Sequence, residues 1–322
     1  MPTVVVTDYT FPSLETEEAI LRPAGAEIVA GQCKTVEALI PLVRQADVVI
    51  TQFAPVKAEV IAAMDSARAI VRYGIGVDNI DLDAARERGI PVCNVPDYCI
   101  DEVADHTLAF LLAATRQVVP HTVHLRGGGW GLATPLDGFW TLRDKTVGVV
   151  GFGRIGREVA ARLAPFKCRR LVADPVVAAD VIDAAGCEAA SVDDLLAQAD
   201  VVTLHCPSTA QTRRMLNAAA IGRMKPGAIV VNLARGDLID TPAFVAALES
   251  GHLGGAALDV CDPEPIPLDS PLRSLPNVIV APHVASVSVK AVKTLRETAA
   301  HIAAMALRGE KLPNIVNGVS QP

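Results

Sequence analysis

Glycines interrupt an apolar run in the middle of the chain. The run Val147–Val150 leads into Gly151, Gly153 and Gly156, and Arg157–Leu163 continues with a helical pattern. In a strand, turn and helix of this kind, the first glycine permits the turn, the second lets the backbone approach a pyrophosphate, and the third lets helix pack on strand. The amides at the start of the helix then face the anion. We therefore predict that the three glycines bind a dinucleotide.

An acidic residue, Asp174, follows the next predicted strand, 18 residues after the last glycine. A carboxylate at this position accepts hydrogen bonds from the ribose hydroxyls and repels a 2′-phosphate. Pro175 and Val176 supply no cation that would compensate for that repulsion. The pattern favours NAD over NADP, and NADP stays open as an alternative because Arg169 and Arg170 come shortly before the strand's end.

Three further polar residues, Arg235, Glu264 and His283, each follow an apolar strand pattern. The carboxyl ends of strands form the edge at which open α/β sheets bind ligands. A guanidinium can hold a carboxylate through two parallel hydrogen bonds, and an imidazole can exchange a proton near neutral pH. A glutamate between two prolines can orient that imidazole and stabilise its protonated form. Taken singly, each has an ordinary structural explanation, as a strand-end arginine in a surface salt bridge, a structural histidine or a solvated loop glutamate.

Beside a dinucleotide site, these three residues together describe one reaction, hydride transfer between a nicotinamide and the carbonyl carbon of a 2-oxo acid. Arg235 would neutralise the carboxylate, His283 would protonate the developing alkoxide, and Glu264 would keep His283 protonated. The hypothesis requires that the three side chains converge on one small organic anion.

The elements that position these residues are short β-branched runs alternating with helical patterns, which indicates parallel sheets in an α/β protein. A long helix is predicted over Asp101–Gln117, with Asp101 as N-cap, and links two units. The alanine-rich tail, 284–307, is predicted to be a helix that returns to cover the first unit. The predicted strands are 2–8, 46–51, 69–74 and 90–95 before the linking helix, and 147–150, 170–173, 200–204, 228–233, 255–258 and 278–280 after it.

Composition narrows the class of protein. A chain of 322 residues with 51% hydrophobic content favours two domains. A formal net charge of −7 argues against a nucleic-acid-binding surface. No apolar run reaches the roughly 18 to 20 residues that span a bilayer, and the N-terminus lacks a cationic segment followed by an apolar one. We expect a cytoplasmic protein without nucleic-acid or membrane partners.

The seven cysteines are widely spaced and form no Cys-x-x-Cys pair, which is typical of reduced thiols. His121 and His124 lie in a loop-like stretch without partner cysteines. Since zinc sites need closely spaced ligand pairs, we expect no metal site.

Several motifs, in the same order, resemble the NAD-dependent D-2-hydroxyacid dehydrogenase family over nearly the whole chain. They are Arg72–Asp81, Gly151–Gly156, Met224–Ala228, Asn232–Gly236, Leu258–Val260 and Ala281–His283. The branch of 3-phosphoglycerate dehydrogenases, hydroxypyruvate reductases and C-terminal-binding proteins is the most similar, and Cys93–Tyr98 points toward the last of these. The resemblance implies a two-lobed α/β fold, in which a Rossmann-type doubly wound NAD-binding domain (99–286) is inserted in a smaller flavodoxin-like substrate domain (1–98 and 287–322).

The resemblance also implies roles for individual residues. Arg235, Glu264 and His283 match the family's catalytic residues, and the backbone of Gly76 and Val77 matches its contact to the substrate carboxylate. Tyr98 is a hypothetical aromatic contact to the substrate. The positions that match cofactor contacts, besides the three glycines, are Val103, Arg154, Ile155, Asp174, Pro207, Thr212, Ala234, Asp259 and His283.

Departures from relatives narrow the substrate. Ile75 stands where phosphite dehydrogenases carry a lysine, and Glu264 stands where formate oxidation would require glutamine. Residues 284–288 lack the aromatic side chain that many relatives have there, so that wall of the pocket is expected to be open. The substrate class is therefore a small 2-oxo or 2-hydroxy acid.

Three further inferences follow from the resemblance. The segment Arg126–Gly131, with Trp130 and Trp140, resembles the one through which relatives dimerise, so we expect a homodimer. The alternative function is an NAD(H)-sensing, corepressor-like binding protein with little catalysis. It is less favoured because binding alone needs no proton donor. An amino-acid-binding regulatory domain, which some phosphoglycerate dehydrogenases possess, is not expected.

Overall fold

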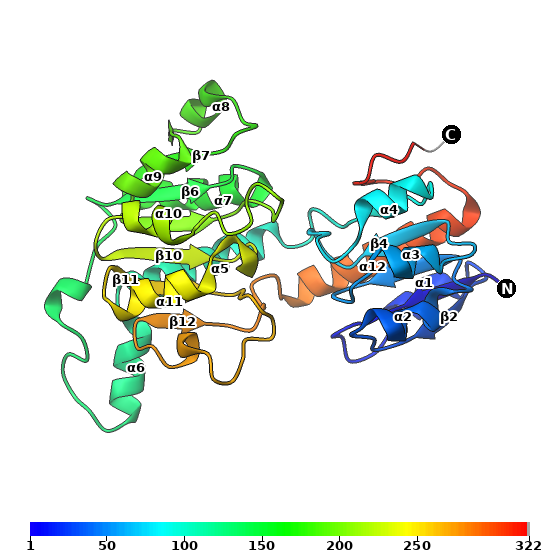
Figure 1. Cartoon of the computed structure of the whole chain (residues 1–322), viewed down its shortest axis with the longest axis horizontal. Coiled ribbons are helices and arrows are strands. Elements are labelled where there is room, and N and C mark those ends of the chain that lie inside the picture. Colours follow the sequence, from blue (N-terminus) through cyan, green and yellow to red (C-terminus); the bar gives the residue numbers. More distant parts are fainter. Residues whose placement is uncertain (321–322) are drawn as a thin grey trace. The chain divides into compact units, whose positions relative to one another are not determined.

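The computed structural model describes residues 1–320, and the chain divides into two compact units. The first unit combines Met1–Tyr98 with the chain from Ser288 onward, and the second is Cys99–Val287. Figure 1 shows the first unit in blue to cyan, with an orange to red returning segment, and the second unit from cyan through green and yellow to orange at β12. Residues 321 and 322 of the predicted substrate domain lie outside the described residues.

The first unit is built on a parallel sheet of five strands in the order β2-β1-β3-β4-β5. This is the order of flavodoxin-like sheets, which confirms the predicted fold class. The strands are β1 (Thr3–Val6), β2 (Glu27–Ala30), β3 (Val48–Thr51), β4 (Ala69–Arg72) and β5 (Val92–Cys93). The helices are α1 (Glu15–Leu21), α2 (Val36–Val43), α3 (Ala58–Ala62), α4 (Leu82–Glu87) and α12 (Val289–Arg308).

Both faces of this sheet are buried, which explains why its inner strands read as continuous apolar runs. Val5 and Val49 contribute to one core, whereas Val4 and Val48, which point the opposite way, contribute to another that includes α12. Helix α12 packs against α1, β3 and β4 (Figure 1). The predicted tail helix is therefore confirmed as a cover of the first sheet, but it begins at Val289, after the N-cap Ser288, and not at residue 284.

The second unit carries a parallel sheet of seven strands in the order β12-β11-β10-β9-β6-β7-β8. Numbered within the unit, the first six strands follow the 3-2-1-4-5-6 order of dinucleotide-binding folds, with one more strand added beside the sixth. The strands are β6 (Thr146–Val150), β7 (Arg169–Ala173), β8 (Glu188–Ala189), β9 (Val201–Leu204), β10 (Ala228–Asn232), β11 (Leu253–Leu258) and β12 (Val278–Val280). The helices are α5 (Ile100–Thr115), α6 (Val118–Arg126), α7 (Arg154–Leu163), α8 (Ala179–Ala184), α9 (Val192–Gln198), α10 (Ala218–Arg223) and α11 (Thr241–Glu249).

Two local predictions were wrong. Asp101 is not the N-cap of α5, because Cys99 holds that position and Asp101 lies in the first turn, where it accepts a hydrogen bond from Arg162. The stretch with His121 and His124 is helix α6 rather than a loop. Pro120 is compatible with that helix because a first-turn amide has no intrahelical partner.

None of the helices formed by residues 1–320 combines the length and the apolar content needed to cross a membrane.

Candidate functional site

Adjacent strands bring the three predicted catalytic residues to one edge of the second sheet. Strands β10, β11 and β12 are parallel neighbours. Arg235 follows β10, Glu264 lies in the loop after β11, and His283 follows β12. The carboxyl ends of neighbouring parallel strands meet at the same edge, so the three residues project from one region.

Glu264 and His283 form a direct pair. Oε2 of Glu264 lies 2.9 Å from Nδ1 of His283, and Oε1 accepts a 2.9 Å hydrogen bond from the Cys261 amide. Burial acts to raise the pKa of Glu264, but the hydrogen bond and charge of His283, together with the Cys261 amide and the charge of Arg235, lower that pKa below its ordinary value. The carboxylate is therefore ionised at neutral pH. Its bond at Nδ1 orients the ring and makes Nε2 the nitrogen that can exchange a proton with a substrate.

Asp259 holds the backbone around His283. The two oxygens of this buried carboxylate accept hydrogen bonds, each of 2.8 Å, from the amides of Val284 and Ala285, and its carbonyl accepts one from the His283 amide, also of 2.8 Å. His283 has a φ of 56°, a left-handed conformation that non-glycine residues adopt only when the surroundings enforce it. Asp259, which the resemblance implies is a cofactor contact, also holds the backbone of His283 through these hydrogen bonds.

We expect Asp259→Asn to lower the free energy of unfolding by about 1–3 kcal/mol, because an asparagine presents one acceptor oxygen to two amides, of which that of Ala285 is buried. Turnover should fall as well, since the strained backbone of His283 loses part of its support. Urea unfolding and steady-state kinetics measure the two effects. The exposed Asp262→Asn in the same loop is the matched control, and an Asp259→Asn variant as stable as the control would contradict the role given to Asp259.

Asn232, a residue that sequence reasoning did not single out, positions Arg235. It is fully buried at the end of β10, where its side chain accepts a 3.0 Å hydrogen bond from the Ala234 amide and donates a 2.8 Å one to the Arg235 carbonyl. The Arg235 guanidinium donates through Nη1 to the Ala234 carbonyl at 2.7 Å. A polar residue that terminates an otherwise apolar strand was the available signal.

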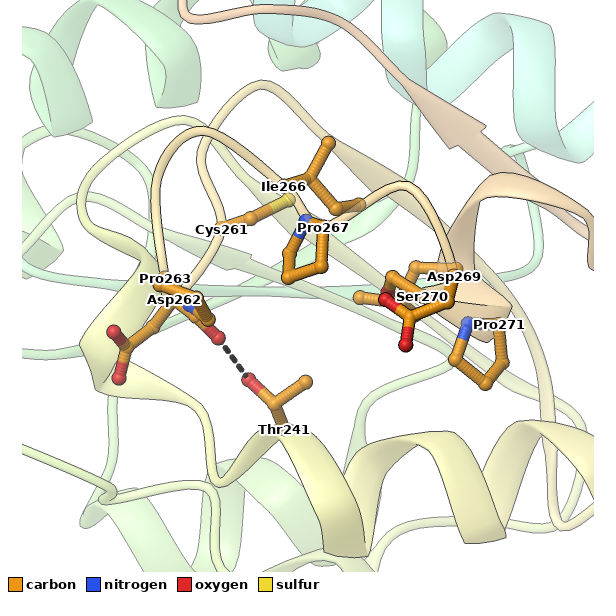
Figure 2. A pocket seen from close by; sticks show the side chains of 10 residues that line it. Thr241, Cys261, Asp262, Pro263, Ile266, Pro267, Asp269, Ser270 and Pro271 are labelled. Carbon is orange, nitrogen blue, oxygen red and sulfur yellow. Dashed lines mark hydrogen bonds between the residues drawn. The ribbon is translucent and has the colours of Figure 1, made fainter.

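The loop that carries Glu264 also borders a cavity of about 260 Å³ (Figure 2). Two of its lining residues are joined directly, because Thr241, at the start of α11, donates a 3.0 Å hydrogen bond to the Asp262 carbonyl. Burial, with the charges of Glu264 and Asp259, raises the pKa of Cys261 to about 11, so the thiol that lines the cavity stays protonated. The lining contains carboxylates and apolar groups but no cation to hold an organic acid; it consists of Thr241, Cys261, Asp262, Pro263, Ile266, Pro267, Asp269, Ser270, Pro271 and Leu272.

The glycine loop joins β6 to α7. Gly151 has a φ of 95°, and a Cβ there would lie 2.7 Å from the Cys206 amide nitrogen. A Cβ on Gly156 would lie 2.1 Å from the Gly151 carbonyl oxygen, whereas one on Gly153 would meet nothing within 4 Å. Gly151 and Gly156 thus permit close packing of the backbone. Gly153 leaves open space at the amino end of α7. The loop fits a dinucleotide pyrophosphate.

Asp174, at the end of β7, ties two loops together. Its Oδ2 accepts a 2.6 Å hydrogen bond from the Phe152 amide, and Oδ1 accepts bonds of 2.9 and 3.2 Å from the amides of Val176 and Val177. A carboxylate has about four acceptor sites. Residues 1–320 use three of them, which leaves one that can accept a hydrogen bond from a ribose hydroxyl.

Arg169 and Arg170 were the reason to keep NADP as an alternative cofactor. In the structure, both guanidinium groups bind partners outside the Asp174 loop. Arg169 pairs with Glu188 at 2.7 Å, and Arg170 donates to the carbonyls of Ala160 and Gly186. Neither guanidinium is engaged with the Asp174 loop by these contacts.

The remaining positions expected to contact the cofactor lie in the second unit. Arg154 and Ile155 form the first turn of α7, and Ala234 precedes Arg235. Thr212 donates a 2.6 Å hydrogen bond to the Pro207 carbonyl in the loop after β9. Val103 is buried in α5, with 6% of its surface exposed.

The expected substrate contacts Gly76, Val77 and Tyr98 belong to the first unit. Gly76 and Val77 lie in the loop after β4 and are partly exposed, and within residues 1–320 their amides donate no hydrogen bond. Two such consecutive amides can bind an anion. Arg72, another residue that sequence reasoning missed, places a buried cation at the start of this loop. Tyr98 packs partly against the core that includes α12.

A family model and two relatives show which known proteins this chain resembles. Residues 108–285 match the family model "D-isomer specific 2-hydroxyacid dehydrogenase, NAD binding domain". A D-3-phosphoglycerate dehydrogenase of Mycobacterium leprae is 41% identical over 280 residues, which cover 87% of this chain and 52% of the relative. A glyoxylate reductase of Korarchaeum cryptofilum is 37% identical over 297 residues, covering 92% of this chain and 87% of the relative. The chain thus spans about half the length of the first of these relatives.

Solved structures agree with this result. The D-lactate dehydrogenase of Aquifex aeolicus, complexed with NAD and lactic acid, superposes with a TM-score of 0.86 at 27% identity, covering 95% of this chain and 96% of that one. A protein of Thermus thermophilus, TT0316, superposes with a TM-score of 0.85 at 37% identity, covering 97% of this chain and 99% of that one.

Proposed function

Because the chain belongs to the D-isomer specific 2-hydroxyacid dehydrogenase family, we propose that it is an NAD-dependent oxidoreductase that interconverts a small 2-oxo acid and its D-2-hydroxy acid. The observation that carries the proposal is the contact between Oε2 of Glu264 and Nδ1 of His283, which lie 2.9 Å apart. This pair lies at the sheet edge at which Arg235 also lies. The same sheet presents the glycine loop and Asp174 for the cofactor. NAD, when bound, accepts or supplies the hydride.

The chain's own residues bind the substrate and transfer the proton. Arg235 binds the substrate carboxylate through its planar guanidinium. His283 gives a proton to the carbonyl oxygen as the alkoxide develops, and takes it back in the oxidative direction. Glu264, held ionised, stabilises the imidazolium and fixes its ring. The amides of Gly76 and Val77 supply further donors to the carboxylate, and Tyr98 contributes an aromatic contact.

The proposal is tested with purified protein, NADH and a panel of glyoxylate, hydroxypyruvate, pyruvate and phenylpyruvate, followed at the nicotinamide absorbance. Oxidation of NADH that depends on the 2-oxo acid is the expected result. The ratios of kcat/KM then define the substrate, because discrimination is a difference in transition-state binding. NADH that stays reduced with every acid in the panel would contradict the proposal.

The non-catalytic alternative, a corepressor-like sensor of NAD(H), is not favoured. The relatives described above are named as dehydrogenases and reductases. A binding protein would also have no need for an imidazole oriented by a carboxylate.

We expect a preference for NADH over NADPH, and we expect Asp174→Ala to lower kcat/KM for NADH by roughly 10- to 100-fold, the value of a charge-assisted hydrogen bond. The same change should reduce the difference in kcat/KM between NADH and NADPH, because the carboxylate that repels a 2′-phosphate is removed. Kinetics with both cofactors measure this, and Asp180→Ala on α8 is the control. Equal turnover of both cofactors by the wild-type protein would refute the preference.

The assembly expected from this site is a homodimer in the cytoplasm. The segment 118–140 exposes apolar side chains that a second copy can cover, among them Val123 (64% exposed), Trp130 (91%) and Leu136 (75%). Light scattering at micromolar concentration is expected to give twice the chain mass, and Trp130→Ser is expected to weaken the dimer. A wild-type monomer would overturn this assignment.

The free thiols of all seven cysteines are compatible with the reducing compartment in which we expect the protein.

A further inference from the structure

A buried polar cluster in the first unit adjoins the loop that carries Gly76 and Val77. It consists of Glu17, Tyr73 and Arg296, of which Glu17 is completely buried and Tyr73 is 1% exposed. Oε1 of Glu17 accepts a 3.0 Å hydrogen bond from the Tyr73 hydroxyl and a 2.9 Å one from Nε of Arg296, and Oε2 accepts a 2.6 Å bond from Nη2. The cluster joins helices α1 and α12 to the residue that follows β4.

Aromatic contacts complete this arrangement. The Phe11 ring meets the Tyr73 ring edge-on, with centroids 5.3 Å apart, and the Arg296 guanidinium lies 4.9 Å from the Phe11 centroid. Burial and the charge of Glu17 raise the pKa of Tyr73, so its hydroxyl remains a donor to the carboxylate. A buried ion pair contributes little net stability, because desolvation offsets its attraction. A role in fixing geometry therefore accounts for the cluster better than a role in stability.

The backbone of Tyr73 and Gly74 transmits that geometry. The Tyr73 amide donates to the Thr51 carbonyl at 2.8 Å, and Arg72 Nη1 donates to the Tyr73 carbonyl at 2.6 Å. The Gly74 carbonyl accepts a 3.0 Å hydrogen bond from the Val95 amide. Gly74 has a φ of 146°, and a Cβ there would lie 1.2 Å from Nη1 of Arg72. Hydrogen bonds to Thr51, Arg72 and Val95 thus hold the backbone of Tyr73 and Gly74, and the φ of Gly74 is one that favours glycine.

We propose that Glu17, Arg296 and Tyr73 are positioning residues, which set where the amides of Gly76 and Val77 meet the substrate carboxylate. The inference rests on the proposed function. Loss of the Tyr73–Glu17 hydrogen bond releases the tyrosine ring and the backbone after it, so substrate affinity falls. The proton donor and the cofactor loop are on the other unit and keep their geometry.

Tyr73→Phe is the sharpest test, because it removes one hydroxyl and leaves Glu17 paired with Arg296. We expect the KM for glyoxylate to rise about tenfold, with kcat within about twofold and the Kd of NADH unchanged. Arg296→Lys, which keeps the charge but loses the planar two-point contact, should change KM in the same direction. The control is Arg22→Gln, which removes the exposed 3.0 Å ion pair with Glu18 and should leave KM unchanged.

Amide hydrogen exchange tests the inference without turnover. In Tyr73→Phe, the amides of Tyr73 and Val95 should exchange at least about tenfold faster than in the Arg22→Gln control, because both hold the loop backbone. If the wild-type protein reduces no 2-oxo acid, the proposed function fails, and faster exchange still supports the positioning role. Unchanged exchange overturns the positioning role. The positioning role is also overturned if KM in Tyr73→Phe is unchanged and kcat falls only in proportion to the folded fraction, which urea unfolding measures.

Discussion

Replacement of His283 by asparagine should lower kcat by about 10²–10⁴-fold, the usual contribution of a positioned acid or base. Asparagine suits this test because it tolerates the left-handed backbone that His283 adopts, with a φ of 56°. Its amide can also donate to Glu264, so the carboxylate keeps a partner. The loss should therefore report the missing proton donor. Steady-state kinetics with NADH and the best substrate of the panel give kcat, and quenching of protein fluorescence gives the Kd of NADH.

The Kd of NADH is expected to stay within about threefold of the wild-type value in His283→Asn, because the glycine loop and Asp174 are untouched. His301→Gln, on the exposed side of α12, is the control for loss of a histidine. A decrease in kcat of less than about fivefold falls well short of an acid–base role and would assign the proton transfer to another group.

Replacement of Arg235 by lysine should raise the KM for the 2-oxo acid by about 10- to 150-fold, which corresponds to the loss of one charge-assisted hydrogen bond. Lysine keeps the positive charge, but its ammonium group cannot make the two parallel bonds of a guanidinium. Arg235→Gln, which also removes the charge, should have the larger effect. Measurements of KM and kcat over a series of 2-oxo acids separate loss of binding from loss of turnover.

Arg223→Lys is a matched control for this series, since Arg223 makes a surface ion pair with Asp193 at 2.7 Å. Exposed ion pairs of this kind contribute roughly 0–1 kcal/mol, and this one lies away from the proposed site. If Arg235→Lys kept the wild-type KM, the carboxylate would have to bind elsewhere, and the first-unit amides of Gly76 and Val77 would become the principal contact.

Sequence reasoning predicts most of the fold because buried parallel strands leave a plain pattern. The apolar runs before Gly151, Arg235 and His283 are all strands, and the order of both sheets agrees with the predicted class. Strand β2 escaped prediction because its side chains are largely exposed, and β8 because it has only two residues. Helix α6 escaped because its glycine-rich neighbours and Pro120 suggested a loop.

The candidate site could likewise be predicted only in part from the sequence. That polar residues after neighbouring strands should lie at one edge follows from topology alone, whereas the contacts between them depend on how each loop returns. The bonds from Asp259 to the amides of Val284 and Ala285 join residues far apart in sequence, and no local pattern reports them. Glu17 and Arg296 are separated by most of the chain, so their pairing was equally inaccessible. The roles given to the site residues remain predictions.

The central claim is that a hydride passes between the nicotinamide and C2 of a 2-oxo acid while His283 supplies the proton. The most direct measurement uses NADH that carries deuterium at both C4 positions and a 2-oxo acid whose reduced product is chiral, such as pyruvate or hydroxypyruvate, with mass spectrometry and chiral separation of the product. The account predicts one deuterium at C2 of a D-2-hydroxy acid, formed in equal amount to the NADH consumed. A product without deuterium at C2, or of the L configuration, would contradict it.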